Sequence, residues 1–409
     1  MIRVWTDNSS AGVLDRSRQR GTTFVYEPAA AGDRAVSVTM PVRLASWDTP
    51  LGVAPIFEMN LPEGALRERL RLAFAKATGR FDDLDLLAIV GRSQLGRIRF
   101  TGADDQLEEG VPFQSVDEIL SSRRGGEFYR YLIEKFATSS GISGVQPKFL
   151  VRDEGMFAAA QGAKRTLSPS FRGATHIVKF WDAAEFPQLA ANEYFCLKAA
   201  ARCGLEVPPH RLAEDGSALV MDRFDLRQDG TYRGFEDFCV LNARRTDEKY
   251  RGSYETNVVR RFQQFANSPT VLQESLHLFT LIALNCAIRN GDAHLKNFGI
   301  VYDEVQGEAH LAPVYDLVTT TAYIPQDRMA LTLNGTNQWP TSKDLIRFGE
   351  GRSLGSRRIL VEIFDRIGDA LSDTARDIVN HSAEHPDFAA VANEMLAQWE
   401  QGRMSLRLS

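Results

Sequence analysis

The pattern of hydrophobic and polar positions changes twice along this 409-residue chain. Up to about residue 120, short β-prone runs such as residues 35–40 alternate with helical segments such as residues 63–78. After about residue 230 the helical period dominates, as in the amphipathic stretch at residues 388–399. We therefore predict an α+β chain with two mixed parts followed by a mainly helical part, bounded at 1–120, 121–230 and 231–409.

Residues 269–288 are mostly apolar with few charges, which predicts a buried helix. Ser268 stands at the expected N-cap and Pro269 at the first helical position, where its missing N–H costs nothing. Gly291 is placed to end the helix. The loop that follows is therefore expected to be carried on a rigid support.

Two apolar runs after this helix, residues 298–302 and 311–315, predict a hairpin whose strands are separated by a polar turn. A hairpin brings its two ends together, so Asn297 before the first strand and Asp316 after the second should meet at one open edge. Their oxygens are the ligands that hard cations such as Mg²⁺ prefer. The hairpin therefore predicts a metal site.

The loop between this helix and the hairpin runs from Arg289 to Asn297 and reads Arg-Asn-Gly-Asp-Ala-His-Leu-Lys-Asn. In protein kinases an Asp orients the hydroxyl nucleophile and an Asn five residues later binds Mg²⁺. Asp292 and Asn297 have that spacing. Asn-Gly-Asp is also ordinary turn chemistry between a helix and a strand. The downstream hairpin and Asp316 favour the catalytic interpretation.

Residues 139–148 read Ser-Ser-Gly-Ile-Ser-Gly-Val-Gln-Pro-Lys and run into an apolar strand. Glycine lets the backbone approach a phosphate with its N–H groups aimed inward, and a lysine adds a point charge. A phosphate cradle here would use Gly144, Val145, Gln146 and Lys148. The loop is neither a Walker A motif nor the Gly-x-Gly-x-x-Gly of common kinases. Taken alone, it is also consistent with a flexible hairpin loop.

A lone lysine, Lys179, lies within the β-prone run His176–Phe180. Burying an ammonium group without a partner is costly, so Lys179 should bind a carboxylate or an ATP phosphate. Glu193, on a helix expected at residues 186–203, is the natural partner because kinases pair a strand lysine with a helix glutamate. The alternative is an edge-strand lysine that faces water.

The next predicted strand, residues 218–222, runs into a polar turn that contains Asp222 and Phe224. A hinge between two lobes would present backbone groups and an aromatic ring to adenine here, although a plain strand end is the simpler interpretation. The order of glycine loop, strand lysine, helix glutamate, hinge, catalytic loop and metal hairpin is the order that a bilobal kinase requires. The order is stronger evidence than any single motif.

In combination, the Gly-Val-Gln-Pro-Lys and Gly-Asp-x-His-x-Lys-Asn loops resemble those of the HipA family. Its members are serine/threonine kinase toxins of bacterial type II toxin–antitoxin (HipBA-like) systems. The resemblance covers nearly the whole chain and includes residues 60–64 and 86–96, which are similar to the family's amino-terminal accessory domain. It implies a bilobal protein-kinase-like fold, with an accessory domain at 1–120, an N-lobe-like region at 121–230 and a mainly helical C-lobe at 231–409.

The resemblance also implies a role for each matching residue. Lys148 and Lys179 correspond to lysines that contact the phosphates of ATP. Asp222 and Phe224 correspond to hinge residues beside adenine, and Asp292 to the catalytic base. The remaining matches are the Mg²⁺ ligands Asn297 and Asp316 and two further catalytic-loop positions, His294 and Lys296.

One position departs from the family pattern. Well-known members carry, three residues before the position of Gly144, a serine whose autophosphorylation ejects the loop and silences the kinase; here that position is Gly141. Related loops have a second serine two places on, where this chain has Ser143. We predict that Ser143 is autophosphorylated, with Ser140 and Ser139 as less favoured sites. A phosphate there would add about −1.5 to −2 charges to a loop that holds the phosphates of ATP.

A net charge of −5 argues against strong nucleic-acid binding by the bare chain. The resemblance implies a HipB-like helix-turn-helix antitoxin as partner, with operator DNA reached only through it. It implies an aminoacyl-tRNA synthetase as substrate, glutamyl-tRNA synthetase by family resemblance, whose phosphorylation halts translation. No run approaches the ~20 apolar residues of a membrane span, and there is no signal-peptide pattern, so a cytoplasmic location without a membrane partner is expected.

Two other functions compete with this one. A small-molecule phosphotransferase of the aminoglycoside or choline kinase type shares the Gly-Asp-x-His-x-x-Asn pattern, but the HipA-like amino-terminal part speaks against it. A non-catalytic co-repressor would only bind antitoxin. Such a protein would have little need to keep the complete set Lys179, Asp292, Asn297 and Asp316.

Overall fold

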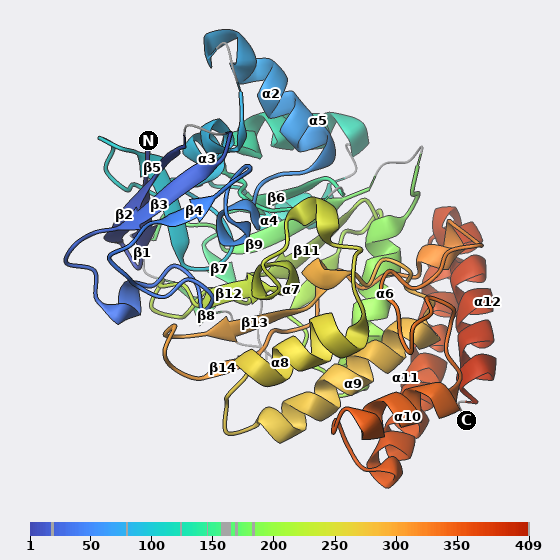
Figure 1. The fold of residues 1–409 in the computed structure, drawn as a ribbon. Coiled ribbons are helices and arrows are strands. Elements are labelled where there is room, and N and C mark those ends of the chain that lie inside the picture. The colour runs from blue at the N-terminus through green and yellow to red at the C-terminus, as the bar shows by residue number, and fades with distance from the viewer. Residues whose placement is uncertain are drawn as a thin grey trace. The chain divides into compact units, whose positions relative to one another are not determined.

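The computed structural model of the chain describes residues 1–17, 20–78, 81–122, 125–144, 146–156, 165–167, 171–181 and 185–407. They belong to two compact units (Figure 1). The first unit comprises Met1–Phe180, Val220–Thr246 and Val301–Ala309, and the second comprises Trp181–Leu219, Asp247–Ile300 and His310–Ser409. Both sheets and long helices are present, which confirms the predicted α+β class.

The first unit begins with a five-stranded sheet of order β4-β3-β2-β1-β5, whose neighbouring strands are antiparallel. Phe24 and Phe100 of this sheet pack edge to face against Phe57, with ring centroids 5.2 and 5.7 Å apart. These buried aromatic rings form part of the core of the unit. The strands are β1 (Ile2–Thr6), β2 (Ser9–Arg16), β3 (Thr22–Tyr26), β4 (Trp47–Thr49) and β5 (Ile98–Gly102).

The strand predicted at residues 35–40 is not formed. This segment contributes only an isolated bridge between Ser37 and Met40. The reason is that a side chain replaces the strand partner: the Tyr26 hydroxyl accepts a hydrogen bond from the Val36 N–H at 3.0 Å and donates one to the Met40 carbonyl. The backbone groups of the segment are satisfied without a ladder.

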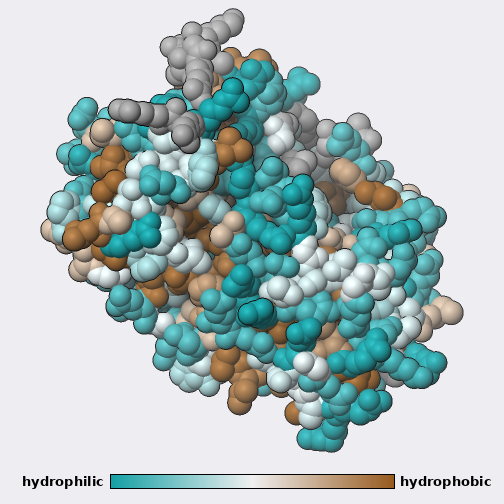
Figure 2. Space-filling view, in the orientation of Figure 1, coloured by the Kyte–Doolittle hydropathy of each residue, from teal (hydrophilic) through white to brown (hydrophobic). Residues whose placement is uncertain are grey.

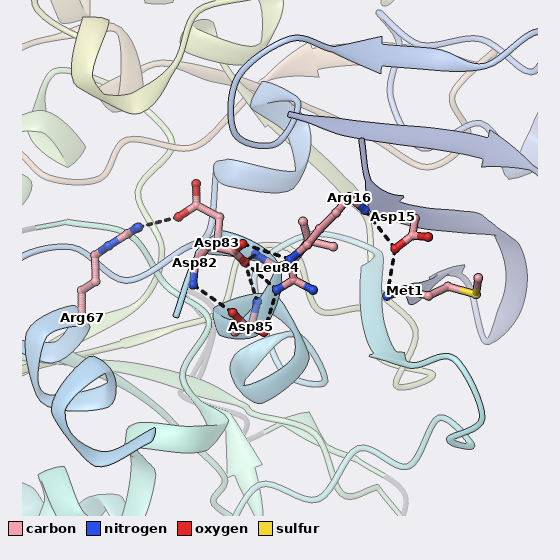
Figure 3. A network of polar contacts seen from close by, with 8 residues as sticks. All are labelled: Met1, Asp15, Arg16, Arg67, Asp82, Asp83, Leu84 and Asp85. Atoms are coloured by element: carbon pink, nitrogen blue, oxygen red, sulfur yellow. Dashed lines mark hydrogen bonds and ion pairs between the residues drawn. The ribbon is translucent and has the colours of Figure 1, made fainter. Parts of the chain in front are cut away.

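A polar network joins β2 to helix α3 (Asp83–Val90) (Figure 3). The Arg16 guanidinium donates to both carboxylate oxygens of Asp82, at 3.0 and 2.9 Å, and to Asp85 at 2.8 Å. Asp82 and Asp85 also form a capping box, in which each carboxylate accepts from the backbone N–H of the other. The ion pairs are partly exposed, so their main effect is to fix where α3 begins.

A second group of strands in the first unit carries the glycine loop. β6 (Lys148–Val151) pairs antiparallel with β9 (His176–Phe180), and the second half of β11 (Ala218–Asp222) lies on the other side of β9. Helix α5 (Gly125–Phe136) packs against β6. The unit also contains α1 (Pro55–Glu58), α2 (Gly64–Thr78), α4 (Val116–Ser121), β7 (Gly155–Met156), β8 (Arg165–Thr166), β12 (Gly234–Asp237) and α7 (Phe238–Leu241).

The second unit is mainly helical, as predicted for the carboxy-terminal part. The long helix α11 (Arg357–Glu384) packs against α6 (Leu189–Arg202), α9 (Val271–Ala287) and α12 (Ala389–Leu406) (Figure 1). Other elements are β10 (His210–Leu212), a π-helical turn (Tyr254–Val259), α8 (Arg260–Phe265) and α10 (Ser342–Gly351). No helix in the described ranges is both long and apolar enough to cross a membrane. On the face shown in Figure 2, hydrophilic residues predominate and hydrophobic residues lie in separate patches.

The buried helix predicted at 269–288 exists as α9, but its start is later than predicted. It begins at Val271 with Thr270 as N-cap. The Ser268 hydroxyl does not cap the backbone because it donates to the Glu274 carboxylate at 2.6 Å. Glu274 also accepts from the Leu311 N–H at 2.8 Å, so this corner of the unit is built around a carboxylate.

The predicted hairpin is present, but its second strand is shifted. β13 (Gly299–Tyr302) agrees with the prediction, whereas β14 (Ala309–Leu311) begins two residues early and ends where the predicted strand begins. The Ala312 N–H still donates to the Gly299 carbonyl at 2.9 Å, but Pro313 has no N–H to offer. The Val314 N–H then donates to the Glu206 carbonyl at 2.8 Å, so the chain has left the hairpin.

Candidate active site

The catalytic-loop segment begins with a sharp exit from α9. Arg289 has a left-handed backbone, with φ of 59°, and the Asn290 side chain donates back to Asn285 at 2.6 Å. The Gly291 N–H donates to the Thr320 hydroxyl at 2.7 Å. A Cβ atom at Gly291 would lie 2.1 Å from the Asp327 carboxylate, so only glycine fits here. The segment is thus held by packing on both sides.

Asp292 follows this glycine and is partly buried. Its N–H donates to the Asn290 side-chain oxygen at 3.1 Å, and its Oδ1 accepts a hydrogen bond from the Tyr250 hydroxyl at 2.7 Å. Burial raises the pKa of Asp292 above its usual value, while the Tyr250 hydrogen bond and the Lys249 charge lower it. A carboxylate whose pKa is raised is a better proton acceptor, which suits a general base.

Asn297 and Asp316 lie together, as the hairpin argument predicted. Asn297 ends a short 3₁₀ turn (Leu295–Asn297), and its Nδ2 donates to the Asp316 carbonyl at 3.1 Å. Its Oδ1 is buried and has no hydrogen-bond partner among the described residues. An orphaned amide oxygen is costly unless a ligand satisfies it. Together with the Asp316 carboxyl group, it is a donor set that fits Mg²⁺.

The backbone of Asp316 is itself unusual. Its φ of 52° places it in the left-handed region, which a residue with a Cβ atom seldom adopts. The neighbouring Tyr315 hydroxyl donates to the Lys296 carbonyl at 2.9 Å, which ties the end of the hairpin to the catalytic loop. Such strain is found most often at functional sites, where the surrounding structure enforces it.

His294 and Lys296 lie in the same loop but differ in environment. His294 is buried, and burial, helped by the Lys249 and Lys296 charges, lowers its pKa to about 3. Its ring is therefore neutral near pH 7 and packs edge to face against Tyr250, with centroids 5.0 Å apart. Lys296 is half-buried. The geometry indicates that His294 supports the loop as a neutral ring.

In the first unit, the two lysines predicted to contact phosphate are neighbours on adjacent strands. Lys148 and Lys179 are directly opposite on the antiparallel strands β6 and β9, so both lie on the same face of the sheet. Their side chains are 5% and 3% exposed. The pairing of β6 with β9 thus puts two buried lysine side chains next to each other. The pair therefore suits a polyanion.

The glycine loop leads into this pair of lysines. Gly144 has a φ of 122°, which favours glycine. A Cβ atom there would lie 2.3 Å from the Lys148 ammonium nitrogen, so the absence of a side chain leaves room for that group. Gln146 donates from Nε2 to the Phe180 carbonyl at 2.9 Å, which fixes the loop to the end of β9. Val145, also predicted to belong to the cradle, lies outside the described residues.

The two candidate serines lie in different environments. The Ser143 hydroxyl donates to the Glu63 carboxylate at 2.5 Å, and its side chain is partly exposed. Ser140 is fully buried, and its hydroxyl accepts from the Leu150 N–H at 3.0 Å. A pocket of about 400 Å³ lies between this loop and the apolar side chains of α2 and α5. Ser143 is therefore the more accessible of the two.

The remaining predicted residues lie on well-formed elements. Asp222 ends β11 and forms an ion pair with His176 of β9, with Nε2 and Oδ1 3.2 Å apart. Phe224 packs edge to face on Phe235 at 5.1 Å. Glu193 is fully buried in α6 of the second unit, whereas Lys179 belongs to the first. The pairing of Lys179 with Glu193 stays a prediction.

Sequence reasoning missed three residues that touch the site. Tyr250 stands 42 positions before its partner Asp292, and Glu63 stands 80 positions before Ser143. Neither belongs to a local motif, so no spacing rule could have found them. Lys249, whose carbonyl accepts from the Leu295 N–H at 3.1 Å, was missed for the same reason.

Comparison with known proteins places these observations in context. The protein-family model described as the HipA N-terminal domain matches residues 2–101. The family model described as the HipA-like C-terminal domain matches residues 140–378. The chain is similar to two Sinorhizobium fredii proteins named "Putative kinase Y4mE" and "Putative kinase Y4dM". They are 26% and 25% identical to it; the matches cover 94% and 80% of this chain and 96% and 75% of the relatives.

Among solved structures, the chain is similar to HipA of Shewanella oneidensis MR-1, determined in complex with HipB and its operator DNA. The TM-score is 0.67 at 19% identity, and the match covers 98% of this chain and 97% of the other. At this identity the likeness shows a shared fold over nearly the full length of both proteins. The expected HipA-like, kinase-type fold is thereby confirmed.

Proposed function

Because this chain belongs to the HipA family, we propose that it is an ATP-dependent serine/threonine protein kinase and the toxin of a toxin–antitoxin system. The observation that carries the proposal is the catalytic loop of the second unit. There Asp292, whose pKa is raised, lies in one loop with Asn297. Asn297 donates to the Asp316 carbonyl, and its buried amide oxygen has no hydrogen-bond partner among the described residues. This is the set of groups that phosphoryl transfer requires.

In the proposed reaction, the hydroxyl oxygen of the acceptor residue forms a bond to the γ-phosphorus of ATP. The bond between that phosphorus and the leaving oxygen of ADP breaks, and Asp292 takes the proton of the hydroxyl group. Asn297 and Asp316 would hold Mg²⁺, which neutralises charge on the phosphates when bound. The catalytic loop would thus supply the base and one metal ligand, and the end of the hairpin would supply the other.

The first unit supplies the residues for ATP binding in this proposal. Lys148 and Lys179 would contact the phosphates, with Gly144 and its neighbours Val145 and Gln146 as the cradle. The strand pairing supports this role because it puts both lysines on the same face of the sheet. Asp222 and Phe224 would lie beside adenine, Glu193 would orient Lys179, and His294 and Lys296 would support the catalytic loop.

We further propose a HipB-like helix-turn-helix antitoxin as partner, with operator DNA bound only through it. The net charge of −5 supports an indirect DNA contact. A protein substrate is part of the same proposal, with an aminoacyl-tRNA synthetase as the class that family membership suggests. Autophosphorylation is assigned to Ser143, because its hydroxyl is accessible and that of Ser140 is buried.

The proposal can be tested by incubating the purified protein with γ-labelled ATP, Mg²⁺ and a bacterial extract. We expect label in protein, on serine or threonine, and at least about a hundredfold less with Asp292→Asn, because loss of a general base typically costs 10²–10⁴-fold. Label found in a small molecule other than ATP and inorganic phosphate, and not in protein, would indicate a small-molecule phosphotransferase. Equal labelling by Asp292→Asn would show that this loop is not catalytic.

A further inference from the structure

The acceptor position on Asp292 already holds a hydroxyl group. The Tyr250 Oη donates to Asp292 Oδ1 at 2.7 Å, which is the hydrogen bond that a substrate hydroxyl makes with a general base. A phenol hydroxyl and an alcohol hydroxyl are the same kind of donor. While Tyr250 is bound in this way, one oxygen of the base is occupied by the protein itself.

The backbone around Tyr250 is anchored, but its side chain is not enclosed. The carbonyl of Lys249 accepts from the Leu295 N–H at 3.1 Å, so this segment is fastened to the catalytic loop. The carbonyl of Gly252 accepts from the Thr332 N–H at 3.1 Å on the other side. Tyr250 itself is 51% exposed. Its ring can therefore rotate away from Asp292 without moving the backbone.

Besides its hydrogen bond to Asp292, the Tyr250 side chain contacts His294 and Lys249. The Tyr250 ring packs edge to face against His294 at 5.0 Å. The Lys249 ammonium lies 5.5 Å from the ring centroid. The hydrogen bond of the Tyr250 hydroxyl to the Asp292 carboxylate is charge-assisted and therefore the stronger interaction. An incoming hydroxyl that makes the same hydrogen bond replaces this interaction, so exchange costs little.

We infer that Tyr250 is an acceptor-site gate: its hydroxyl occupies Asp292 until the substrate hydroxyl displaces it. The inference rests on the proposed function, since it takes Asp292 as the base. Its consequence is that water cannot take the place of the acceptor on Asp292 Oδ1 while Tyr250 is bound there, which should slow the hydrolysis of ATP. Tyr250 is thus a positioning and specificity residue, and the chemistry stays with Asp292.

The test compares Tyr250→Phe with the unaltered protein in phosphate release from Mg²⁺–ATP, without an added acceptor. Phe keeps the ring and its packing on His294 but frees Asp292, so we expect release to rise at least threefold with the KM for ATP unchanged. Tyr323→Phe is the matched control, because it also removes one hydroxyl of the second unit, one that donates to the Pro187 carbonyl at 2.9 Å. That control should release phosphate at the original rate.

A second measurement does not depend on turnover. With 3-fluorotyrosine incorporated at all tyrosines, the ¹⁹F resonance missing from Tyr250→Phe identifies residue 250. This resonance should move in Asp292→Asn and should stay in place in Tyr323→Phe. An unmoved resonance, or phosphate release that is unchanged or slower in Tyr250→Phe, would overturn the gate while leaving the kinase intact. If the unaltered protein neither releases nor transfers phosphate, the proposed function itself fails.

Discussion

At the residue scale, Asn297 is the strongest support for the proposed metal site. Its amide nitrogen is used by the Asp316 carbonyl and its backbone N–H by the His294 carbonyl at 3.0 Å, while its Oδ1 is buried without a hydrogen bond among the described residues. Proteins seldom leave such an oxygen unsatisfied. The sequence placed Asn297 next to Asp316 through the hairpin, but it could not show which atom of the amide would be left over.

We predict that Asn297→Ala weakens Mg²⁺-dependent nucleotide binding. Loss of one ligand should lower the affinity for ATP in Mg²⁺ by at least about tenfold, or ~1.4 kcal/mol, and leave binding in EDTA nearly unchanged. Isothermal titration in both buffers measures this. Asn393→Ala, at an exposed site on α12, is the matched control and should bind as the original protein does. A similar loss in both buffers would point to a folding defect instead of a metal role.

At the scale of elements, the sequence predicted most of what places the site. β9 and β13 have the predicted bounds, or nearly so, because short apolar runs between polar turns leave few alternatives. Two element predictions were wrong, each because of a side-chain hydrogen bond that the pattern of hydrophobic and polar residues does not reveal. The Tyr26 hydroxyl takes the place of a strand partner at residues 36–40, and Glu274 captures the hydroxyl that should have capped α9.

A buried carboxyl group ties several elements of the first unit together. Glu236 of β12 accepts from the Ser37 hydroxyl at 2.7 Å, the Val38 N–H at 2.8 Å and the Tyr302 hydroxyl at 2.7 Å. Burial raises the pKa of Glu236 to about 7, despite these three hydrogen bonds. In an unfolded chain the value would be about 4.5. The folded state thus binds a proton that the unfolded state releases.

This pKa shift predicts how stability depends on pH. Because the folded pKa is raised, the contribution of Glu236 to stability is complete below about pH 4.5 and is lost as the pH rises through about 7. The loss amounts to about 3 kcal/mol in order of magnitude. Urea unfolding of the first unit, followed from pH 5 to 8, should show it. Glu236→Gln cannot titrate, so its stability should change less over this range; an equal change in both proteins would contradict the assignment.

For the molecule as a whole, the fold and the family could be predicted from the sequence. Two loop motifs and the order of six motifs along the chain were sufficient for that prediction. The match over 98% of the chain to a HipA structure confirms the fold. Contacts between distant positions were out of reach. Tyr250 with Asp292, and Glu63 with Ser143, are joined by the fold across 42 and 80 positions. Both contacts belong to the proposed control of the site, whereas the proposed chemistry was inferred from local motifs.

Intact-mass and peptide mass spectrometry of the purified protein after incubation with Mg²⁺–ATP should detect the proposed kinase activity on the protein itself. The protein should gain phosphate, located on Ser143, because this hydroxyl is partly exposed in the glycine loop. Asp292→Asn, treated in the same way, should gain none. A phosphate gain of equal size in Asp292→Asn, or no gain in the unaltered protein, would contradict the account of a self-phosphorylating kinase that uses Asp292 as its base.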